Sequence, residues 1–120
     1  MRAAILGCIA ALSCLSPHLW SGSCRFGVVR QFVGHGVGRV FHAAPMVLHY
    51  RNNEDQGKMQ VGQTFTIEPM LTEGTTRHKM WNDKWTAVTA DLKLTAQFEH
   101  TILITDKGFE VLTAYEGSGF

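Results

Sequence analysis

Short apolar runs separated by polar turns dominate the sequence from residue 25 onward. Runs that are rich in β-branched and aromatic residues and bounded by Gly, Pro, Asn or Asp are typical of β-strands. We therefore predict strands at residues 26–33, 64–68, 85–89, 96–105 and 110–113. Apart from one turn near residues 58–61, the pattern indicates no amphipathic helix, so we expect a mostly antiparallel sheet.

Glycines and polar residues mark the connections between these runs. Three glycines within residues 34–38 predict a turn with unusual backbone angles or a close approach to a ligand. No Lys-Ser or Lys-Thr pair follows this stretch, so we do not expect it to cradle a phosphate. Residues 44–50 are predicted to be extended, 51–57 to form a polar loop, and 106–108 to close a hairpin.

Composition and charge restrict the class of protein. The chain has 120 residues, 45% of them apolar and 18% charged, which is typical of one globular domain. A net charge of +1 gives no electrostatic case for binding nucleic acid or acidic lipid. All ten acidic residues lie between Glu54 and Glu116. Chemistry that needs a carboxylate must therefore use the second half of the chain or a group outside it.

The first 24 residues differ from the rest. Cys8, Cys14 and Cys24 are odd in number and lack zinc-knuckle spacing, so we interpret them as small apolar residues. A basic start, an apolar run at 3–15 and small residues at 21–23 have the layout of a secretory signal peptide. The apolar run is too short to span a bilayer. The alternatives are an organellar transit peptide, a buried helix, or a stray start to a truncated gene model.

Four residues are the candidates for chemistry: His35 among its glycines, His42, Glu68 and Glu99. Both glutamates lie in apolar strand-like segments, where a charged group is rarely buried unless it is paired or bound to a metal. His35, Glu68 and Glu99 therefore form a candidate ligand set for Mn, Co, Fe or Zn. The alternative is that both glutamates point to solvent from alternating strands.

The remaining histidines and tryptophans are expected to have structural roles. Only residue type makes His49, His78 and His100 candidate ligands. Histidines on the surface or in the core are far commoner than metal-binding ones. Trp81 and Trp85 flank a short polar turn, and core packing is the usual role of tryptophan.

Several segments together resemble one protein family. They are residues 34–38 with Phe41, His42 and Pro45, then 66–70, then Trp85-Thr86, and finally 97–101. In order and spacing, from about Phe26 to Ala114, they are similar to the C-terminal part of a type I methionine aminopeptidase, closest to the plant organellar forms. The resemblance implies the C-terminal half of a pita-bread fold, an α/β (more narrowly α+β) class, here mostly antiparallel curved sheet with few helices. It also implies metal-dependent removal of the N-terminal methionine from nascent polypeptides.

The resemblance also implies roles for individual residues. His35, Glu68 and Glu99 would be metal ligands, and Glu99 would bridge two divalent ions. The metal would be Co, Mn, Fe or Zn. His42 and Glu68 would be catalytic: His42 would bind substrate and stabilise the transition state, and Glu68 would relay a proton. Phe41 and Trp85 would line the pocket for the methionine side chain.

The sequence departs from the family in two respects. The family also needs two aspartate ligands and another active-site histidine from its N-terminal half, and residues 1–24 contain neither an aspartate nor a match to that histidine. One His and two Glu remain, which are enough ligands for one metal ion or none in this chain. Half of such a fold should also expose apolar sheet and be only marginally stable. The family usually has glycine after the aspartate at Asp91, where this chain has Leu92. Leucine would cost energy if that turn needs a positive φ.

Two hypotheses follow for the chain as a whole. In the first, residues 25–116 are a partial catalytic domain of an organellar metalloaminopeptidase, preceded by a signal-like or aberrant leader at 1–24 and followed by a tail at 117–120. In the second, the chain is a short product without catalysis that acts as a binding or decoy module for nascent N-termini. The resemblance implies a chloroplast or mitochondrial location rather than a secretory one, no nucleic-acid partner, no membrane span, and a monomer when complete.

Overall fold

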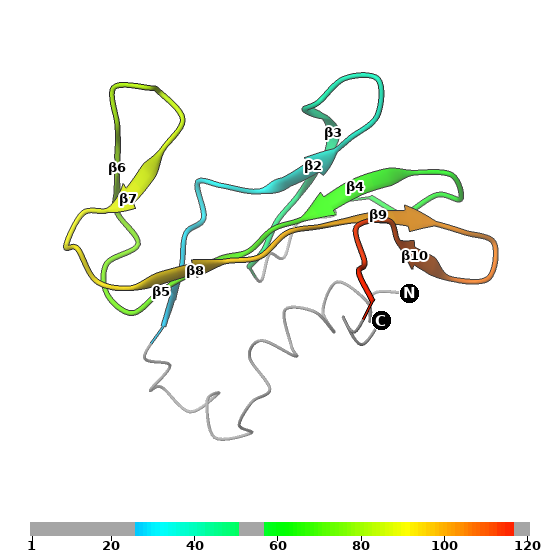
Figure 1. Ribbon diagram of the computed structural model, residues 1–120. Helices are drawn as coiled ribbons and strands as arrows, with labels where there is room; N and C mark the ends of the chain where they lie inside the picture. Colours follow the sequence, from blue (N-terminus) through cyan, green and yellow to red (C-terminus); the bar gives the residue numbers. More distant parts are fainter. Residues whose placement is uncertain (1–25, 51–56, 117–120) are drawn as a thin grey trace.

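The computed structural model describes residues 26–50 and 57–116, which form three antiparallel sheets (Figure 1). Within these residues there is no helix, which agrees with the predicted sheet-rich class. The strands are β1 (Gly27–Val28), β2 (Gly34–Gly36), β3 (Ala43–Val47), β4 (Thr64–Ile67), β5 (Met70–Thr72), β6 (His78–Met80), β7 (Ala87–Thr89), β8 (Thr95–Gln97), β9 (His100–Ile104) and β10 (Phe109–Val111).

The largest sheet has five strands in the order β10-β9-β4-β2-β3. A three-stranded sheet has the order β1-β5-β8, and β6 pairs with β7. The leader expected at 1–24, nearly all of the expected loop at 51–57, and the tail at 117–120 lie outside the described residues. No helix within the described ranges is long and apolar enough to cross a membrane.

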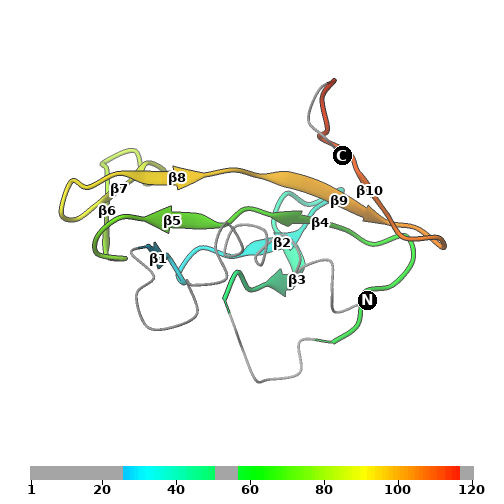
Figure 2. The ribbon, with the colours of Figure 1, turned by 90° about the horizontal axis from the view of Figure 1, so that it is seen from below.

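One long strand pair crosses two of the sheets. Ile67 pairs with His100 where β4 meets β9, and Met70 pairs with Gln97 where β5 meets β8. Two residues on each side lie between these pairs, so the register continues without a bulge and sets Glu68 opposite Glu99. Figures 1 and 2 show β8 running on into β9 beside β5 and β4.

An interruption in this strand pair corrects two of the predicted strands. The strand predicted at 96–105 is divided at residues 98 and 99, and a separate strand, β5, follows the one predicted at 64–68. Pro69 explains the interruption because it has no N–H to donate to the ladder. Both glutamates of the predicted site therefore lie at the interruption and not within a strand.

The glycine-rich segment is a strand, not the predicted turn. Residues 34–36 form β2, which lies between β3 and β4, whereas only Gly27–Val28 of the strand predicted at 26–33 is extended in a ladder. A Cβ on Gly34 would lie 2.2 Å from the Thr66 carbonyl oxygen, and one on Gly36 would lie 2.1 Å from that of Ala44. These glycines allow close approach of neighbouring backbone and do not adopt a positive φ.

The hairpins agree with the pattern in part. The predicted hairpin at 106–108 is confirmed, with Phe109 opposite Ile104 across β9 and β10. The strand predicted at 85–89 begins at Ala87, and its partner β6 was not predicted because His78–Met80 has no alternation of apolar and polar residues. The turn expected near 58–61 is centred slightly later, where the Gln63 N–H donates to the Gln60 carbonyl at 3.1 Å.

The core of the described part is small. Five buried apolar side chains pack together in the five-stranded sheet, namely Val47, Phe65, Ile67, Ile102 and Ile104. Many large apolar side chains are exposed, among them Trp85 at 71%, Phe98 at 74% and Leu94 at 72%. Of the exposed large apolar side chains in the described residues, only Met46, Met80 and Phe109 lie on strands, so this surface belongs mainly to turns and loops and only in part to the sheets.

Candidate functional site

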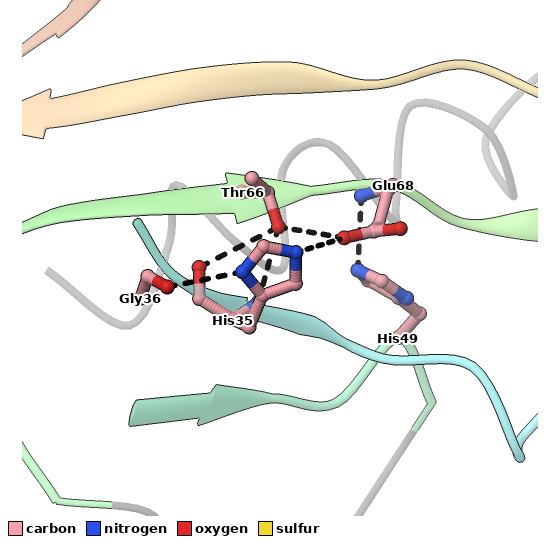
Figure 3. A network of polar contacts seen from close by, with 5 residues as sticks. All are labelled: His35, Gly36, His49, Thr66 and Glu68. Atoms are coloured by element: carbon pink, nitrogen blue, oxygen red, sulfur yellow. Dashed lines mark hydrogen bonds and ion pairs between the residues drawn. The ribbon is translucent and has the colours of Figure 1, made fainter. Parts of the chain in front are cut away.

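Two of the predicted site residues lie in direct contact. His35 is the central residue of β2, and Glu68 directly follows β4, the strand beside it. The His35 Nε2 atom lies 3.4 Å from Glu68 Oε1, and each side chain is only 14% exposed (Figure 3). Strand pairing thus brings together a ligand-type imidazole and a carboxylate that are far apart in the sequence.

The backbone sets which nitrogen of His35 faces the carboxylate. Its Nδ1 lies 3.0 Å from the Gly36 carbonyl oxygen, which can only accept, so Nδ1 carries the hydrogen. In the neutral ring Nε2 then has a free lone pair, and that lone pair faces a carboxylate oxygen. Two such atoms repel one another unless a cation lies between them. A proton on Nε2, which makes an ordinary ion pair, and a divalent metal ion would each meet this need.

A buried hydroxyl joins these two residues. Thr66 is 2% exposed, and its Oγ1 accepts the His35 backbone N–H at 3.0 Å. The same hydroxyl donates its hydrogen to Glu68 Oε1 at 2.7 Å. One side chain therefore contacts both the imidazole residue, through its backbone, and the carboxylate (Figure 3).

A buried histidine contacts Glu68 from the other side. His49 is 1% exposed, and its Nε2 accepts the Glu68 backbone N–H at 3.1 Å. Burial lowers the pKa of His49, while the Glu68 carboxylate and the Phe32 carbonyl raise it less. The neutral ring that burial favours is the form that has a lone pair for this hydrogen bond. Holding a backbone amide from a buried position is a structural role, which is what we expect of this histidine.

Glu99 lies outside this contact pair. Glu99 is exposed, and the strand register sets it opposite Glu68. Like charges directly opposite on paired strands destabilise a sheet unless a cation neutralises them. Over residues 26–50 and 57–116, no group of three or more His, Cys, Asp or Glu side chains lies close enough together to hold a metal ion.

The other three predicted residues form an aromatic cluster beside His35. The His42 ring centroid lies 4.4 Å from that of His35 and 4.4 Å from that of Phe41. Trp85 is further away, with its ring centroid 6.5 Å from that of His42. Phe41 and Trp85 are 62% and 71% exposed, so this cluster presents apolar surface next to the pair of His35 and Glu68. Such a surface suits an apolar ligand side chain.

The turn between β6 and β7 holds Trp85 in this cluster. Asp83 Oδ1 accepts the backbone N–H of Trp85 at 3.0 Å and that of Thr86 at 2.9 Å. The Thr86 hydroxyl donates to the other carboxylate oxygen at 2.6 Å. Hydrogen bonds from the Thr86 side chain and from both backbone amides lower the pKa of Asp83. This aspartate therefore closes a turn and is not part of the ligand pair.

Comparisons with known proteins show the family to which this chain is similar. The family model described as metallopeptidase family M24 matches residues 9–106. Methionine aminopeptidase 1D, chloroplastic/mitochondrial, of Arabidopsis thaliana is 67% identical over 89 residues, which cover 74% of this chain and 25% of the relative. Methionine aminopeptidase 1 of Dictyostelium discoideum is 59% identical over 73% of this chain and 24% of its own length. The chain spans about a quarter of the length of these relatives.

Solved structures give the same result. The crystal structure of methionine aminopeptidase from Rickettsia prowazekii matches with a TM-score of 0.69 and 44% identity, over 75% of this chain and 37% of that one. The enzyme from Thermotoga maritima matches with a TM-score of 0.69 and 47% identity, over 75% of this chain and 36% of its own. The described sheets therefore correspond to part of a larger fold.

Proposed function

Because this chain belongs to metallopeptidase family M24, we propose that it is part of a metal-dependent aminopeptidase that removes the N-terminal methionine from nascent polypeptides. The names of its relatives support the reaction and the substrate. The observation that carries the proposal is the contact of His35 Nε2 with Glu68 Oε1, held between two strands at 3.4 Å. It supports a metal-dependent reaction because an imidazole nitrogen and a carboxylate oxygen, which are both common ligands of divalent metals, face one another in a largely buried position.

We propose that His35, Glu68 and Glu99 would hold a divalent metal ion, namely Mn, Co, Fe or Zn. Because the three side chains do not lie together here, the exposed Glu99 side chain must turn toward the pair of His35 and Glu68. A divalent ion in such a site acts as a Lewis acid and lowers the pKa of water. Glu68 is then the group that accepts and passes on a proton, since an ionised carboxylate has free lone pairs beside the reacting atoms. His42 donates a hydrogen bond to the substrate, and Phe41 and Trp85 pack against its methionine side chain.

Residues 25–116 are, in this proposal, a partial catalytic domain. One His and two Glu supply ligands for one metal ion, bound weakly, and further ligands must come from groups outside this part of the chain. The alternative is a product without catalysis that binds nascent N-termini through its aromatic cluster. We propose in addition that the complete protein is a monomer. We also propose that it acts in a chloroplast or mitochondrion, which the name of the Arabidopsis relative supports.

The proposal is tested by transplanting the chain into a relative. Residues 26–116 would replace the matching segment of the Rickettsia prowazekii enzyme, and release of methionine from a Met-Ala-Ser peptide would be measured with added Mn²⁺ or Co²⁺. We expect turnover by the chimera, loss of turnover with Glu68→Ala, and retained turnover with Glu110→Ala, which removes an exposed carboxylate on β10.

The 120-residue chain alone provides the second arm of this experiment, and we expect it to release no methionine. A folded chimera without metal-dependent turnover would contradict the proposed reaction. Metal-dependent turnover by the chain alone, lost on Glu68→Ala, would instead contradict the proposal that its catalytic domain is partial.

A further inference from the structure

We propose that Thr66 is a positioning residue that sets the orientation of the Glu68 carboxylate relative to His35 before metal binds. This inference rests on the proposed function, in which His35 and Glu68 are ligands. It goes beyond that function because it assigns a role to a residue that is not itself a ligand.

The first step concerns the freedom of Glu68. The β4–β9 ladder ends at the pairing of Ile67 with His100, so no strand partner holds the Glu68 amide. His49 Nε2 accepts this amide at 3.1 Å, which fixes the backbone of Glu68 at the interruption. The carboxylate is still separated from that backbone by rotatable side-chain bonds, so its direction needs a second contact.

Thr66 supplies that contact. Its hydroxyl has one hydrogen, and the short distance of 2.7 Å to Glu68 Oε1 assigns that hydrogen to the carboxylate. Its lone pairs are then free to accept the His35 backbone N–H at 3.0 Å. The oxygen to which Thr66 donates is the same Oε1 that lies 3.4 Å from His35 Nε2. One hydroxyl thus fixes the position of one oxygen relative to one nitrogen.

The surroundings make this contact rigid. Thr66 lies in β4, at the centre of the five-stranded sheet, and is 2% exposed, so water does not compete for its hydroxyl. Its backbone pairs with Thr101 on β9. Removing a hydrogen-bond partner of a metal ligand typically lowers metal affinity by roughly 10–100-fold. We expect a loss of this size when the hydroxyl is removed.

The test uses the full chain and three variants. Thr66→Val has the shape of threonine without its hydroxyl, and Thr66→Ser restores the hydroxyl. Thr72→Val is the matched control, since Thr72 is an equally buried threonine on β5 and its hydroxyl contacts the Gly74 carbonyl and neither ligand residue. Calorimetry would measure Mn²⁺ affinity, and amide hydrogen exchange without metal would measure protection of the His35 N–H.

We expect Thr66→Val to lose affinity for Mn²⁺ by roughly 10–100-fold and to lose protection of the His35 amide. Thr66→Ser should restore both, and Thr72→Val should change neither. Wild-type affinity in a folded Thr66→Val, or no restoration by serine, would overturn the positioning role. The positioning role would also be overturned if the wild-type chain bound no Mn²⁺ and the His35 amide kept its protection in Thr66→Val. The proposed reaction is decided separately, by turnover of the chimera.

Discussion

Leu92 adopts a left-handed backbone conformation, with a φ of 62°, in the turn that leads from β7 to β8. Its side chain is 87% exposed and gains little from packing. The condition under which we expect leucine to cost energy here is therefore met, because the backbone of this turn has a positive φ at Leu92. An L-residue in this conformation costs about 1–2 kcal/mol relative to glycine.

We therefore predict that Leu92→Gly stabilises the chain by about 1 kcal/mol, part of the gain being offset by the greater freedom of glycine in the unfolded state. Urea unfolding followed by circular dichroism would measure the change. Leu92→Ala is the control, since it removes the same exposed side chain beyond Cβ but keeps the unfavourable conformation. Equal stability of the glycine and alanine variants would show that the backbone is not the cause.

The site itself was predictable only where residue type carries the signal. His35 and Glu68 stand out because a histidine among glycines and a carboxylate in an apolar strand need an explanation. Thr66 and the contact of His49 with Glu68 do not stand out. Their roles arise from hydrogen bonds between residues that are 31 and 19 positions apart in the sequence, and no local pattern records such pairings.

At the scale of elements, the pattern predicted the strands that have apolar side chains on a buried face. β4 and β9 were found for this reason. The hairpin that leads to β10, whose Phe109 and Glu110 are exposed, was found from the turn residues at 106–108. β2 was predicted as a turn because glycine has no side chain to reveal a face. Its identity as a strand comes from its neighbours, since the close approach of the Thr66 and Ala44 carbonyls leaves no room for a Cβ.

This close packing gives a prediction for β2. In Gly36→Ala the new Cβ would lie 2.1 Å from the Ala44 carbonyl oxygen, so one of the two strands must shift. We expect a loss of about 1–3 kcal/mol, typical of overpacking, in the free energy of unfolding. Gly38→Ala is the matched control, because its Cβ would meet no atom within 4 Å and its φ is not positive. Urea unfolding that gives the same midpoint for both variants would contradict the proposed reason for these glycines.

At the scale of the whole molecule, the part of the chain that the structure describes combines a small core with many exposed apolar side chains. Five side chains form the core cluster, whereas residues such as Leu94, Phe98 and Trp85 are more than two-thirds exposed. The net charge of +1 gives little repulsion between copies. Contiguous exposed apolar surface promotes association, so we expect the purified chain to bind an apolar dye and to associate as its concentration rises.

Replacing Leu94 and Phe98 by lysine distinguishes apolar surface from charge as the cause. This double variant removes two exposed apolar side chains and adds two positive charges, whereas Asn82→Lys with Gln97→Lys adds the same charges at exposed polar positions. Dye fluorescence and sedimentation velocity over a range of concentrations should show a marked decrease for the first pair and a small one for the second. Equal decreases would show that added positive charge, and not the loss of apolar surface, reduces association. A wild-type chain that stays monomeric and binds no dye would show that its apolar residues are covered in solution.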